Sequence, residues 1–454
     1  MLEKVFKLKQ NGTSVKTELM AGLTTFMTMA YILAVNPSIL GDAGMDPSAV
    51  LLATAIASFI ATCCMAFMAN LPFALSAGMG LNAFFAYTVV LGFGYSWQIA
   101  LLAVFVEGLI FLAMSLSGIR EAIFNSIPYQ LKQAVSVGIG IFIAFIGLQN
   151  SGLCVDNPAT LVGIVDFSQF GNRELCALLA LFGTMFTAIL YIKEVKGAIL
   201  LGILFTWFVG IACELTGIYV PDPSAKFFSL LPSMSLTDFS KLGLTFGQCF
   251  NFDMSGVSMF NFAVIVLSFL FVDLFDTLGT IIGVSAKAKM LDEHGRLAQI
   301  RPALVADSIA TAAGAVLGTS TTTTFVESSA GVAVGGRTGL TALTTAVLFL
   351  GSMLFAPIFT AIPSFATAPA LIIVGFLMFS NVTQLKMTEE NYHTAIPCYL
   401  CVLAMPLFYS ISEGISFGVI SYVLICMFCG KRKEINTVMY IIAVLFVLKY
   451  IFLE

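Results

Sequence analysis

Apolar runs close to 20 residues long recur along the whole of this 454-residue chain. About 20 consecutive apolar residues are what a helix needs to cross the hydrocarbon core of a bilayer. Hydrophobic residues make up 59% of the sequence and charged residues only 10%, which excludes an ordinary soluble domain. Because backbone polar groups inside a bilayer must be satisfied within the protein, we expect the runs to be helices. The sequence therefore predicts an all-α polytopic membrane protein whose partner is the lipid bilayer and not nucleic acid.

We expect about 14 transmembrane spans, counted as apolar runs of suitable length. They cover residues 17–37, 48–69, 73–92, 97–117, 131–150, 174–192, 197–217, 259–285, 302–318, 321–336, 340–361, 366–385, 393–411 and 413–430. A further apolar run at 436–452 is either an extra span or a helix lying in the membrane interface.

The distribution of basic residues predicts an N-terminus inside the cell. With that orientation, the basic residues between spans fall on the cytoplasmic side, as the positive-inside rule requires. They are Arg120, Lys132, Lys193, Lys196, Lys287, Lys289, Arg296, Arg301, Arg337, Lys386 and Lys431–Arg432–Lys433. The longest linker, about 218–258, falls outside and contains only two lysines. The expected location is the cytoplasmic (inner) membrane.

The chain also contains an internal repeat. Ser76-Ala77-Gly78 recurs 253 residues later as Ser329-Ala330-Gly331, and Ile127-Pro128 is matched by Ile362-Pro363. Several matches in the same order suggest two halves of seven spans each. Since seven is odd, the second half begins from the opposite side of the membrane, which gives the inverted repeat common among secondary transporters.

Spans 3 and 10 look broken. Thr321 to Phe325 is polar and β-branched, which favours extended backbone, and Gly78, Gly80 and Gly331 allow close approach. Extended backbone at membrane depth is tolerated only where it is buried in protein or lines a cavity. Interrupted segments at matching places in two halves indicate a transporter's binding site. Asn82 and Glu327 lie at these breaks; the alternative for Glu327 is a helix-capping acid.

Several acidic residues lie well inside expected spans. Asp273 and Asp276 are the only charges between Met259 and Val284. An Asp at the centre of a membrane helix costs about 2.5 kcal/mol or more, so the pair indicates a substrate or proton site. Their spacing places both on one helical face. Glu107 and Asp307 are candidates for a proton or network role, or else hydrogen-bonded structural acids.

Four motifs carry a family resemblance: KTELMAGLTTFMTMAYILAVNP, GMGLNAFFAY, VDLFDTLGT and TTTTFVESSAGVAVGGRTGLTA. Across essentially its whole length, the chain resembles the adenine/guanine/hypoxanthine permeases, the AzgA-like branch of the nucleobase–ascorbate transporter superfamily. The resemblance implies a core domain (1–120 with spans 1–4, and 259–361 with spans 8–11). It also implies a gate domain (121–258 with spans 5–7, and 362–454 with spans 12–14), through which a homodimer forms. The implied activity is proton-coupled uptake of hypoxanthine, guanine or adenine by an elevator-like movement.

By motif position, the family's binding residues fall on Asn82, Asp273 and Glu327, with Asp276 also implicated. A purine base has N–H groups along one edge, and a carboxylate accepts two such bonds at once. Asn offers a donor and an acceptor to the opposite edge. Additional expected substrate contacts are the ring of Phe325, the hydroxyl of Thr277 and the backbone at Gly80.

Proton coupling needs a carboxyl group that takes up a proton on one side and releases it on the other. The candidates are Asp276, Asp273 and Glu107; we expect Asp273 to contact substrate and Asp276 to serve coupling. No metal site or other cofactor is expected, because the coupling ion is a proton. The sequence leaves open which purine is preferred.

Two other functions are alternatives to purine transport. An anion transporter, or a xanthine or uracil transporter, would use the same fold; an anion carrier predicts a basic residue near the broken spans. None lies in 71–87 or in 318–335. An intramembrane enzyme is disfavoured because the sequence contains no HExxH motif and no P-loop lysine.

Overall fold

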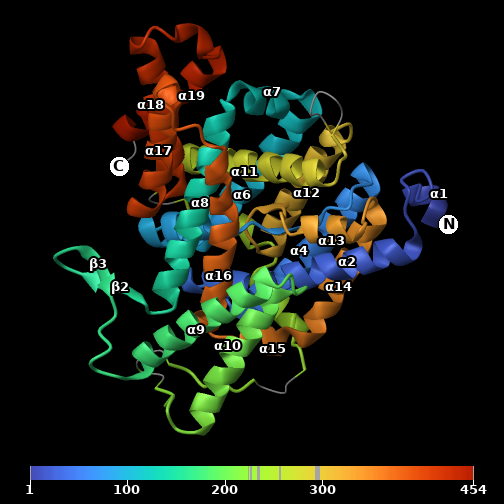
Figure 1. The fold of residues 1–454 in the computed structure, drawn as a ribbon, viewed down its shortest axis with the longest axis vertical. Coiled ribbons are helices and arrows are strands. Elements are labelled where there is room, and N and C mark those ends of the chain that lie inside the picture. The colour runs from blue at the N-terminus through green and yellow to red at the C-terminus, as the bar shows by residue number, and fades with distance from the viewer. Residues whose placement is uncertain are drawn as a thin grey trace.

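The computed structural model describes residues 2–222, 224, 227–232, 236–254, 257–291 and 297–452, so Arg296 lies outside the described residues. It is mostly helical (Figure 1). The α-helices are α1 Leu2–Phe6, α2 Val15–Met29, α3 Ile32–Asp42, α4 Pro47–Cys64, α5 Met79–Ala83, α6 Trp97–Ser117, α7 Ile119–Ser126, α8 Tyr129–Asn150, α9 Asn172–Ile192, α10 Ala198–Leu215, α11 Met259–Lys287, α12 Ile300–Leu317, α13 Ser328–Val334, α14 Gly339–Ser352, α15 Ala356–Thr360, α16 Ser364–Phe379, α17 Tyr392–Leu407, α18 Ile411–Phe428 and α19 Thr437–Phe452. The strands are β1 Leu75–Ala77, β2 Cys154–Asn157, β3 Leu161–Ile164 and β4 Thr322–Thr324.

Within the described ranges, 11 helices are long and apolar enough to cross a membrane, so the multi-pass architecture is confirmed. The other three expected spans coincide with shorter elements. Spans 3 and 10 are each a strand followed by a short helix, and span 13 is α17, which has 16 residues with Pro397 and Pro406 inside it. The count of 14 remains a prediction.

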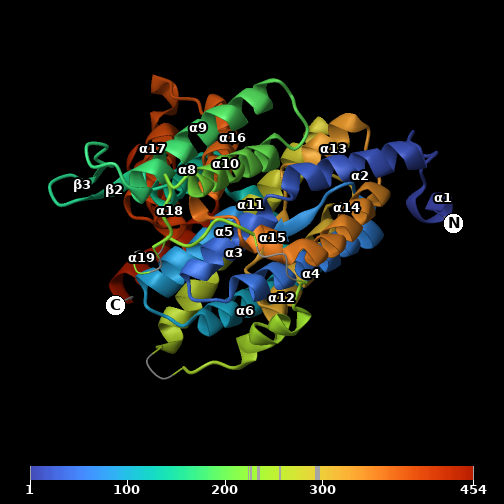
Figure 2. The same ribbon diagram turned by 90° about the horizontal axis from the view of Figure 1, so that it is seen from below.

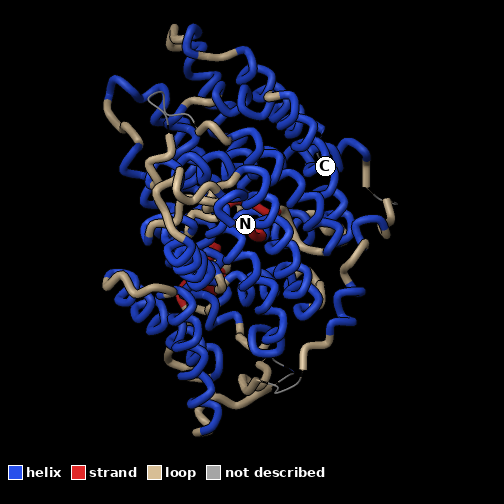
Figure 3. The backbone as a smooth tube through the Cα atoms, turned by 90° about the vertical axis from the view of Figure 1, so that its right-hand side faces the viewer, coloured by secondary structure: helices blue, strands red, loops and turns tan. Residues whose placement is uncertain are grey.

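The extended segments expected in spans 3 and 10 are confirmed as β1 and β4. They pair antiparallel, with Ser76 opposite Thr323, and every residue of both strands is buried. Two more backbone bonds extend the ladder, from Gly78 N to the carbonyl of Thr321 and from Phe325 N to that of Ala74, each 3.0 Å long. The pairing satisfies extended backbone inside the protein, as a low-dielectric interior demands. Figure 3 shows how little strand the chain contains among its helices.

By their packing the helices form two groups that contact each other, with α10 against α2 and α8 against α11 (Figures 1 and 2). On one side α2 packs on α13 and α14, while α4 and α6 pack on α12. On the other side α8 packs on α16 and α17, and α9 packs on α10 and α16. Gly140 of α8 lies against Gly375 of α16, where an added Cβ would come within 2.6 Å of the Gly375 carbonyl oxygen. This contact lets the two helix backbones approach closely.

A buried acid, Glu18 of α2, joins two helices of the first group. Its carboxylate accepts hydrogen bonds from the backbone N–H groups of Arg337, Thr338 and Thr341 at the start of α14. The hydroxyls of Thr338 and Thr341 also bond to it, at 2.8 and 2.6 Å. Since the first N–H groups of a helix lack partners within the helix, this carboxylate completes the end of α14. Glu18 is therefore a fully satisfied structural acid.

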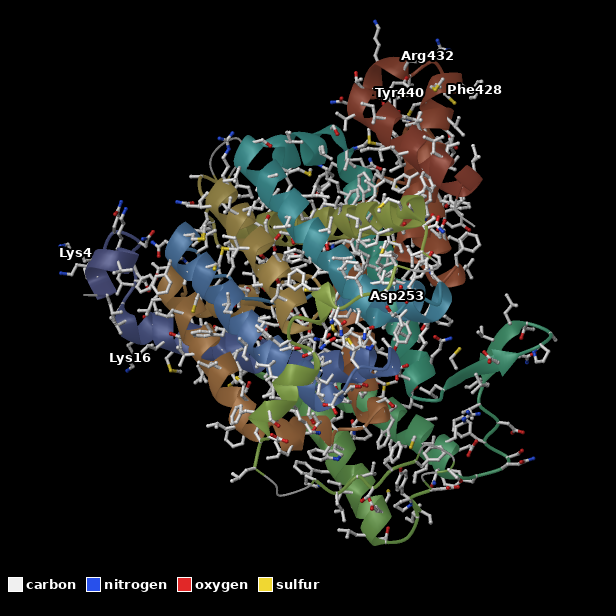
Figure 4. The ribbon with its side chains drawn as sticks, turned by 180° about the vertical axis from the view of Figure 1, so that it is seen from behind. Lys4, Lys16, Asp253, Phe428, Arg432 and Tyr440 are labelled. Carbon is white, nitrogen blue, oxygen red and sulfur yellow. The ribbon has the colours of Figure 1, made fainter. Side chains whose placement is uncertain are left out.

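The residues of the apolar run 436–452 form α19, which packs antiparallel to α18. Near the turn between them, the Tyr422 hydroxyl donates to the Glu434 carbonyl, 3.3 Å away. At the other end, the buried Lys449 forms an ion pair with Glu413. Figure 4 shows Phe428, Arg432 and Tyr440 gathered at the tip of this helix pair.

Two details differ from the sequence expectation. A hairpin, β2 paired with β3, projects from the end of α8 (Figure 1). The residues of β3 are mostly exposed, and the sequence has no alternating apolar pattern there that would predict a strand. In addition, the repeated Ser-Ala-Gly segments are not structurally equivalent, because Ser76 and Ala77 are in β1 whereas Ser329 and Ala330 are in α13. The connection from α4 to β1 is longer than that from α12 to β4, and it includes a five-residue π-helix, Met65–Ala69, that prolongs α4.

Candidate functional site

The predicted site residues at the two broken spans lie beside the paired strands. Asn82, in α5, is fully buried; its side-chain oxygen accepts from the Ser320 hydroxyl, and its side-chain nitrogen has no partner among the described residues. The backbone N–H of Asn82 donates to Gly78, 2.8 Å away, so the short helix begins directly after β1. Asn82 thus presents an unused N–H donor in a buried setting.

Glu327 lies where β4 gives way to α13. It occupies the N-cap position, but its side chain makes no capping hydrogen bond. Instead its Oε1 accepts a 2.7 Å bond from the hydroxyl of Tyr31, which precedes α3. Glu327 remains 9% exposed, whereas Tyr31 is fully buried. The carboxylate is therefore oriented by Tyr31 and not by the helix that follows it.

Asp276 and Asp273 of α11 contact different partners, although their spacing predicts one face. Asp276 accepts from the hydroxyl of Thr323 in β4, at 3.4 Å. Asp273 is fully buried and accepts from Thr277 at 2.6 Å through one oxygen and from Arg120 at 3.4 Å through the other. Asp276 is thus joined to the strand pair, and Asp273 to an ion-pair cluster.

Arg120 is the residue that the sequence reasoning missed. It was assigned to a cytoplasmic loop, but its side chain is fully buried and forms ion pairs with Asp307 at 2.8 Å and with Asp273 at 3.4 Å. Its guanidinium also lies over the ring of Phe111, 3.8 Å from the centroid. The available signal was the surplus of intramembrane acids, since buried charges in proteins are paired.

Glu107 of α6 is a further intramembrane acid, and it is fully buried. Its Oε2 accepts a 2.8 Å bond from the hydroxyl of Thr321, directly before β4. Its Oε1 has no hydrogen-bond partner among the described residues. Asp273, Asp307 and Arg120 are the charged groups close enough to act on it.

The other predicted substrate contacts, Phe325, Thr277 and Gly80, lie in different surroundings. Phe325 is buried directly after β4, and Thr277 is held between Asp273 and Asp307, at 2.6 and 3.2 Å. Gly80 faces the second helix group: an added Cβ would lie 3.0 Å from Ile139 of α8. Its lack of a side chain therefore lets α8 approach α5, and a role in substrate binding stays a prediction.

Two carboxylate acceptors (Glu327, Asp276) and an amide donor (Asn82) thus lie beside the strand pair, and all three are mostly buried. Such a set suits a neutral molecule that presents N–H groups on one edge and an acceptor on another. Among the described residues, no group of three or more His, Cys, Asp or Glu has an arrangement that could hold a metal ion.

Comparison with known proteins gives matches along nearly the full chain. Residues 16–417 match the profile described as the Permease family. A putative permease of Methanocaldococcus jannaschii is 45% identical and covers 100% of this chain and 99% of its own length. A guanine/hypoxanthine permease of Bacillus subtilis is 42% identical, covering 100% of both chains. An adenine permease of Escherichia coli is 39% identical and covers 100% of this chain and 97% of its own.

Solved structures show the same fold at low identity. The transmembrane domain of the cyanobacterial bicarbonate transporter BicA superposes with a TM-score of 0.60 at 16% identity, covering 89% of this chain and 97% of that one. The murine solute carrier 26 family member A9 anion transporter gives 0.59 at 11% identity, covering 91% and 68%. These neighbours support a transporter fold and say nothing about the cargo of this chain.

Proposed function

Since the chain belongs to the permease family, in its branch of adenine, guanine and hypoxanthine permeases, we propose that it carries purine nucleobases across the membrane. The observation that carries this proposal is the similarity over the whole chain to an adenine permease, at 39% identity, and to a guanine/hypoxanthine permease, at 42% identity. The preferred base among hypoxanthine, guanine and adenine is left to experiment.

The site chemistry supports a purine as cargo. Glu327 and Asp276 supply carboxylate oxygens for N–H groups of the base, and Asn82 supplies an N–H donor that has no partner within the described residues. Because a buried donor without a partner is costly, a bound acceptor would stabilise Asn82. We place Asp276 with substrate and Asp273 with the ion-pair cluster, which exchanges the roles expected from sequence. Both oxygens of Asp273 are already engaged, by Thr277 and Arg120.

We propose that transport is driven by protons. One charge crossing 100 mV is worth about 2.3 kcal/mol. That free energy concentrates a substrate roughly 50-fold. The candidate carriers expected from sequence are Asp276, Asp273 and Glu107. With Asp276 placed at the substrate, Asp273 beside Thr277 and Glu107 beside Thr321 remain.

For the movement, we propose that a core of residues 1–120 and 259–361 slides as an elevator against a gate of 121–258 and 362–454. Gly140 and Gly375 support an inverted repeat, because they contact each other and are 235 positions apart, as are Pro128 and Pro363, which precede α8 and α16. Equivalent residues that touch lie near a two-fold axis. We further propose an inner-membrane location with the N-terminus inside, and a homodimer formed through the gate.

We propose to move one boundary of this division. Residues 239–250 of the long linker were expected in the gate, but they pack on the core helices α4, α6 and α12. Gly247 N donates to the Val316 carbonyl at 2.7 Å, and Phe250 stacks edge-on against Phe105 with centroids 5.1 Å apart. By contrast, Trp207 of α10 bonds the Leu230 carbonyl at 2.8 Å. The contacts therefore favour a boundary between residues 232 and 239.

The cargo is tested by uptake of radiolabelled hypoxanthine in a strain that lacks its own purine permeases. Unlabelled guanine, hypoxanthine or adenine should compete, whereas uracil should not. Competition by uracil or xanthine alone would replace the proposal with the alternative nucleobase transporter. Competition by bicarbonate or chloride alone would favour an anion carrier, like the murine anion transporter that shares this fold.

The driving force is tested in the same cells. A protonophore should abolish accumulation at constant Na⁺, and external acidification should raise the rate. Replacing Na⁺ by choline should change little. Uptake that requires Na⁺ and ignores the protonophore would overturn proton coupling while leaving the purine assignment in place.

A further inference from the structure

The cluster around Arg120 joins four helices in the interior of the protein. Arg120 is in α7, Glu107 in α6, Asp273 in α11 and Asp307 in α12, and all four residues are fully buried. Besides the two aspartates, Arg120 donates to the carbonyl of Leu304 at 3.4 Å. The guanidinium is therefore held in place by acceptors on two neighbouring helices.

The charges in this cluster do not balance. Three carboxyl groups, on Glu107, Asp273 and Asp307, face one guanidinium among the described residues. Arg120 contacts both aspartates directly, whereas no hydrogen bond joins it to Glu107 in the described structure. With all four groups ionised, three negative charges and one positive charge leave a net charge of −2. A buried charge without a partner is expensive, so neutralisation by a cation is most favourable at the carboxyl group that the guanidinium does not contact.

The unpartnered oxygen identifies that group as Glu107. Thr321 bonds its Oε2 at 2.8 Å, but Oε1 is buried with no partner. Glu18 provides the contrast within the same chain, because it is an equally buried acid whose carboxylate accepts five hydrogen bonds of 3.2 Å or less from the start of α14. Oε1 of Glu107 is one of several buried side-chain atoms without a hydrogen-bond partner in the described residues, and it is the one among them that belongs to a carboxyl group. Such an atom calls for a missing partner.

A short path connects Glu107 to the substrate residues. Thr321, which bonds Glu107, also accepts the backbone N–H of Gly78 through its carbonyl, 3.0 Å away. The residue before it, Ser320, donates to the side-chain oxygen of Asn82. Two adjacent residues, Thr321 and Ser320, therefore link the hydrogen bond of Glu107 to the side chain of Asn82.

We propose that Glu107 is the group that binds the coupling proton, and that Arg120 is a positioning residue that directs the proton there by occupying Asp273 and Asp307. The inference rests on the proposed proton-coupled transport. The step is a simple proton transfer: water on one side supplies H⁺ to Oε1 of Glu107, and the same proton leaves to water on the other side after the core has moved. The neutral carboxyl group leaves one net negative charge fewer in the cluster.

The first test is Glu107→Gln in proteoliposomes, with wild type and Glu18→Gln as controls. In Glu107→Gln we expect exchange of labelled for unlabelled hypoxanthine to persist, while accumulation driven by a pH gradient falls to the equilibrium level. Glu18→Gln should lower thermal stability and keep pH-driven accumulation. Wild-type accumulation by Glu107→Gln would overturn the proposal, as would loss of both exchange and hypoxanthine binding in a folded protein. If wild type itself ignores the pH gradient, the proposed proton coupling fails instead, and a Na⁺ requirement that is lost in Glu107→Gln would make the site a sodium site.

The second test addresses Arg120 through the pH profile of uptake. Arg120→Lys keeps the charge but loses the fork that reaches two aspartates at once. We expect Arg120→Lys to fold and to have a pH profile of uptake that is displaced from that of wild type. In the double variant with Glu107→Gln, Arg120→Lys should cause no such displacement. Should Arg120→Lys fail to fold, Arg120→Gln combined with Asp307→Asn removes one charge of each sign and serves in its place. An unchanged profile in the folded variant, or an equal displacement without Glu107, would show that Arg120 is only structural.

Discussion

Replacing Glu327 by Gln is the sharpest test of the substrate site. The side chain keeps its shape, but the acceptor oxygen that faces the N–H groups of a base is lost or replaced by an amide donor. A hydrogen bond to a charged group is worth about 1.5–3 kcal/mol. Truncating one partner of a buried charged pair costs about 2–5 kcal/mol. Taking about 2–4 kcal/mol, we expect the Kd for hypoxanthine to rise roughly 30- to 700-fold.

Tyr31→Phe is the matched control for this change. It removes the hydroxyl that donates to Glu327 at 2.7 Å but leaves the carboxylate in place. We expect a loss of about 1 kcal/mol, or roughly fivefold in Kd, from weaker orientation of Glu327. Both variants should be compared with wild type by equilibrium binding of labelled hypoxanthine to purified protein, with thermal stability measured in parallel. Wild-type affinity in Glu327→Gln would remove Glu327 from the site, and equal losses in both variants would indicate that the pair supports the fold and not the substrate.

Two further predictions concern other positions. Asp276→Asn should weaken hypoxanthine binding, whereas Asp273→Asn should retain binding and displace the pH profile of uptake, because Arg120 loses one of its two carboxylate partners. Loss of binding in Asp273→Asn with binding retained in Asp276→Asn would restore the roles expected from sequence. Gly140→Ala or Gly375→Ala should destabilise the protein by about 1–3 kcal/mol through overpacking of α8 against α16. Gly351→Ala should be neutral because no atom lies within 4 Å of its added Cβ. Thermal unfolding in detergent measures this difference, and equal melting temperatures for the three glycine variants would contradict the close packing.

The broken spans were predictable because their signal is local. A run of β-branched threonines disfavours helix, and the glycines before α5 permit close backbone approach. The pairing of β1 with β4 was not predictable, since it joins Ser76 to Thr323 across most of the chain. The π-helix at Met65–Ala69 was not predictable either, so the gapless comparison matched Ser76-Ala77, which lie in a strand, with Ser329-Ala330, which lie in a helix.

The ion-pair cluster shows a different limit of the sequence. The apolar run 97–117 ends just before Gly118, and Arg120 comes two residues later. The positive-inside rule therefore assigns Arg120 to a cytoplasmic loop. Only the packing of α7 near α11 and α12 brings its long side chain to Asp273 and Asp307. The separation of Asp273 from Asp276 is equally a tertiary effect, because helical spacing alone places them together.

The antiparallel packing of α19 on α18 affects how the topology of this chain can be measured. The turn at Lys431–Lys433 and the Lys449–Glu413 ion pair lie at opposite ends of the helix pair. An epitope joined after α19 would therefore emerge at the far end of α18 from that turn. The test uses sealed vesicles of known orientation and a Lys433→Cys variant. An antibody added outside should reach the epitope only in those vesicles in which an external thiol reagent does not label position 433. A C-terminal fluorescent fusion would consequently report on the compartment opposite the basic turn, and the choice of fusion partner has to allow for that.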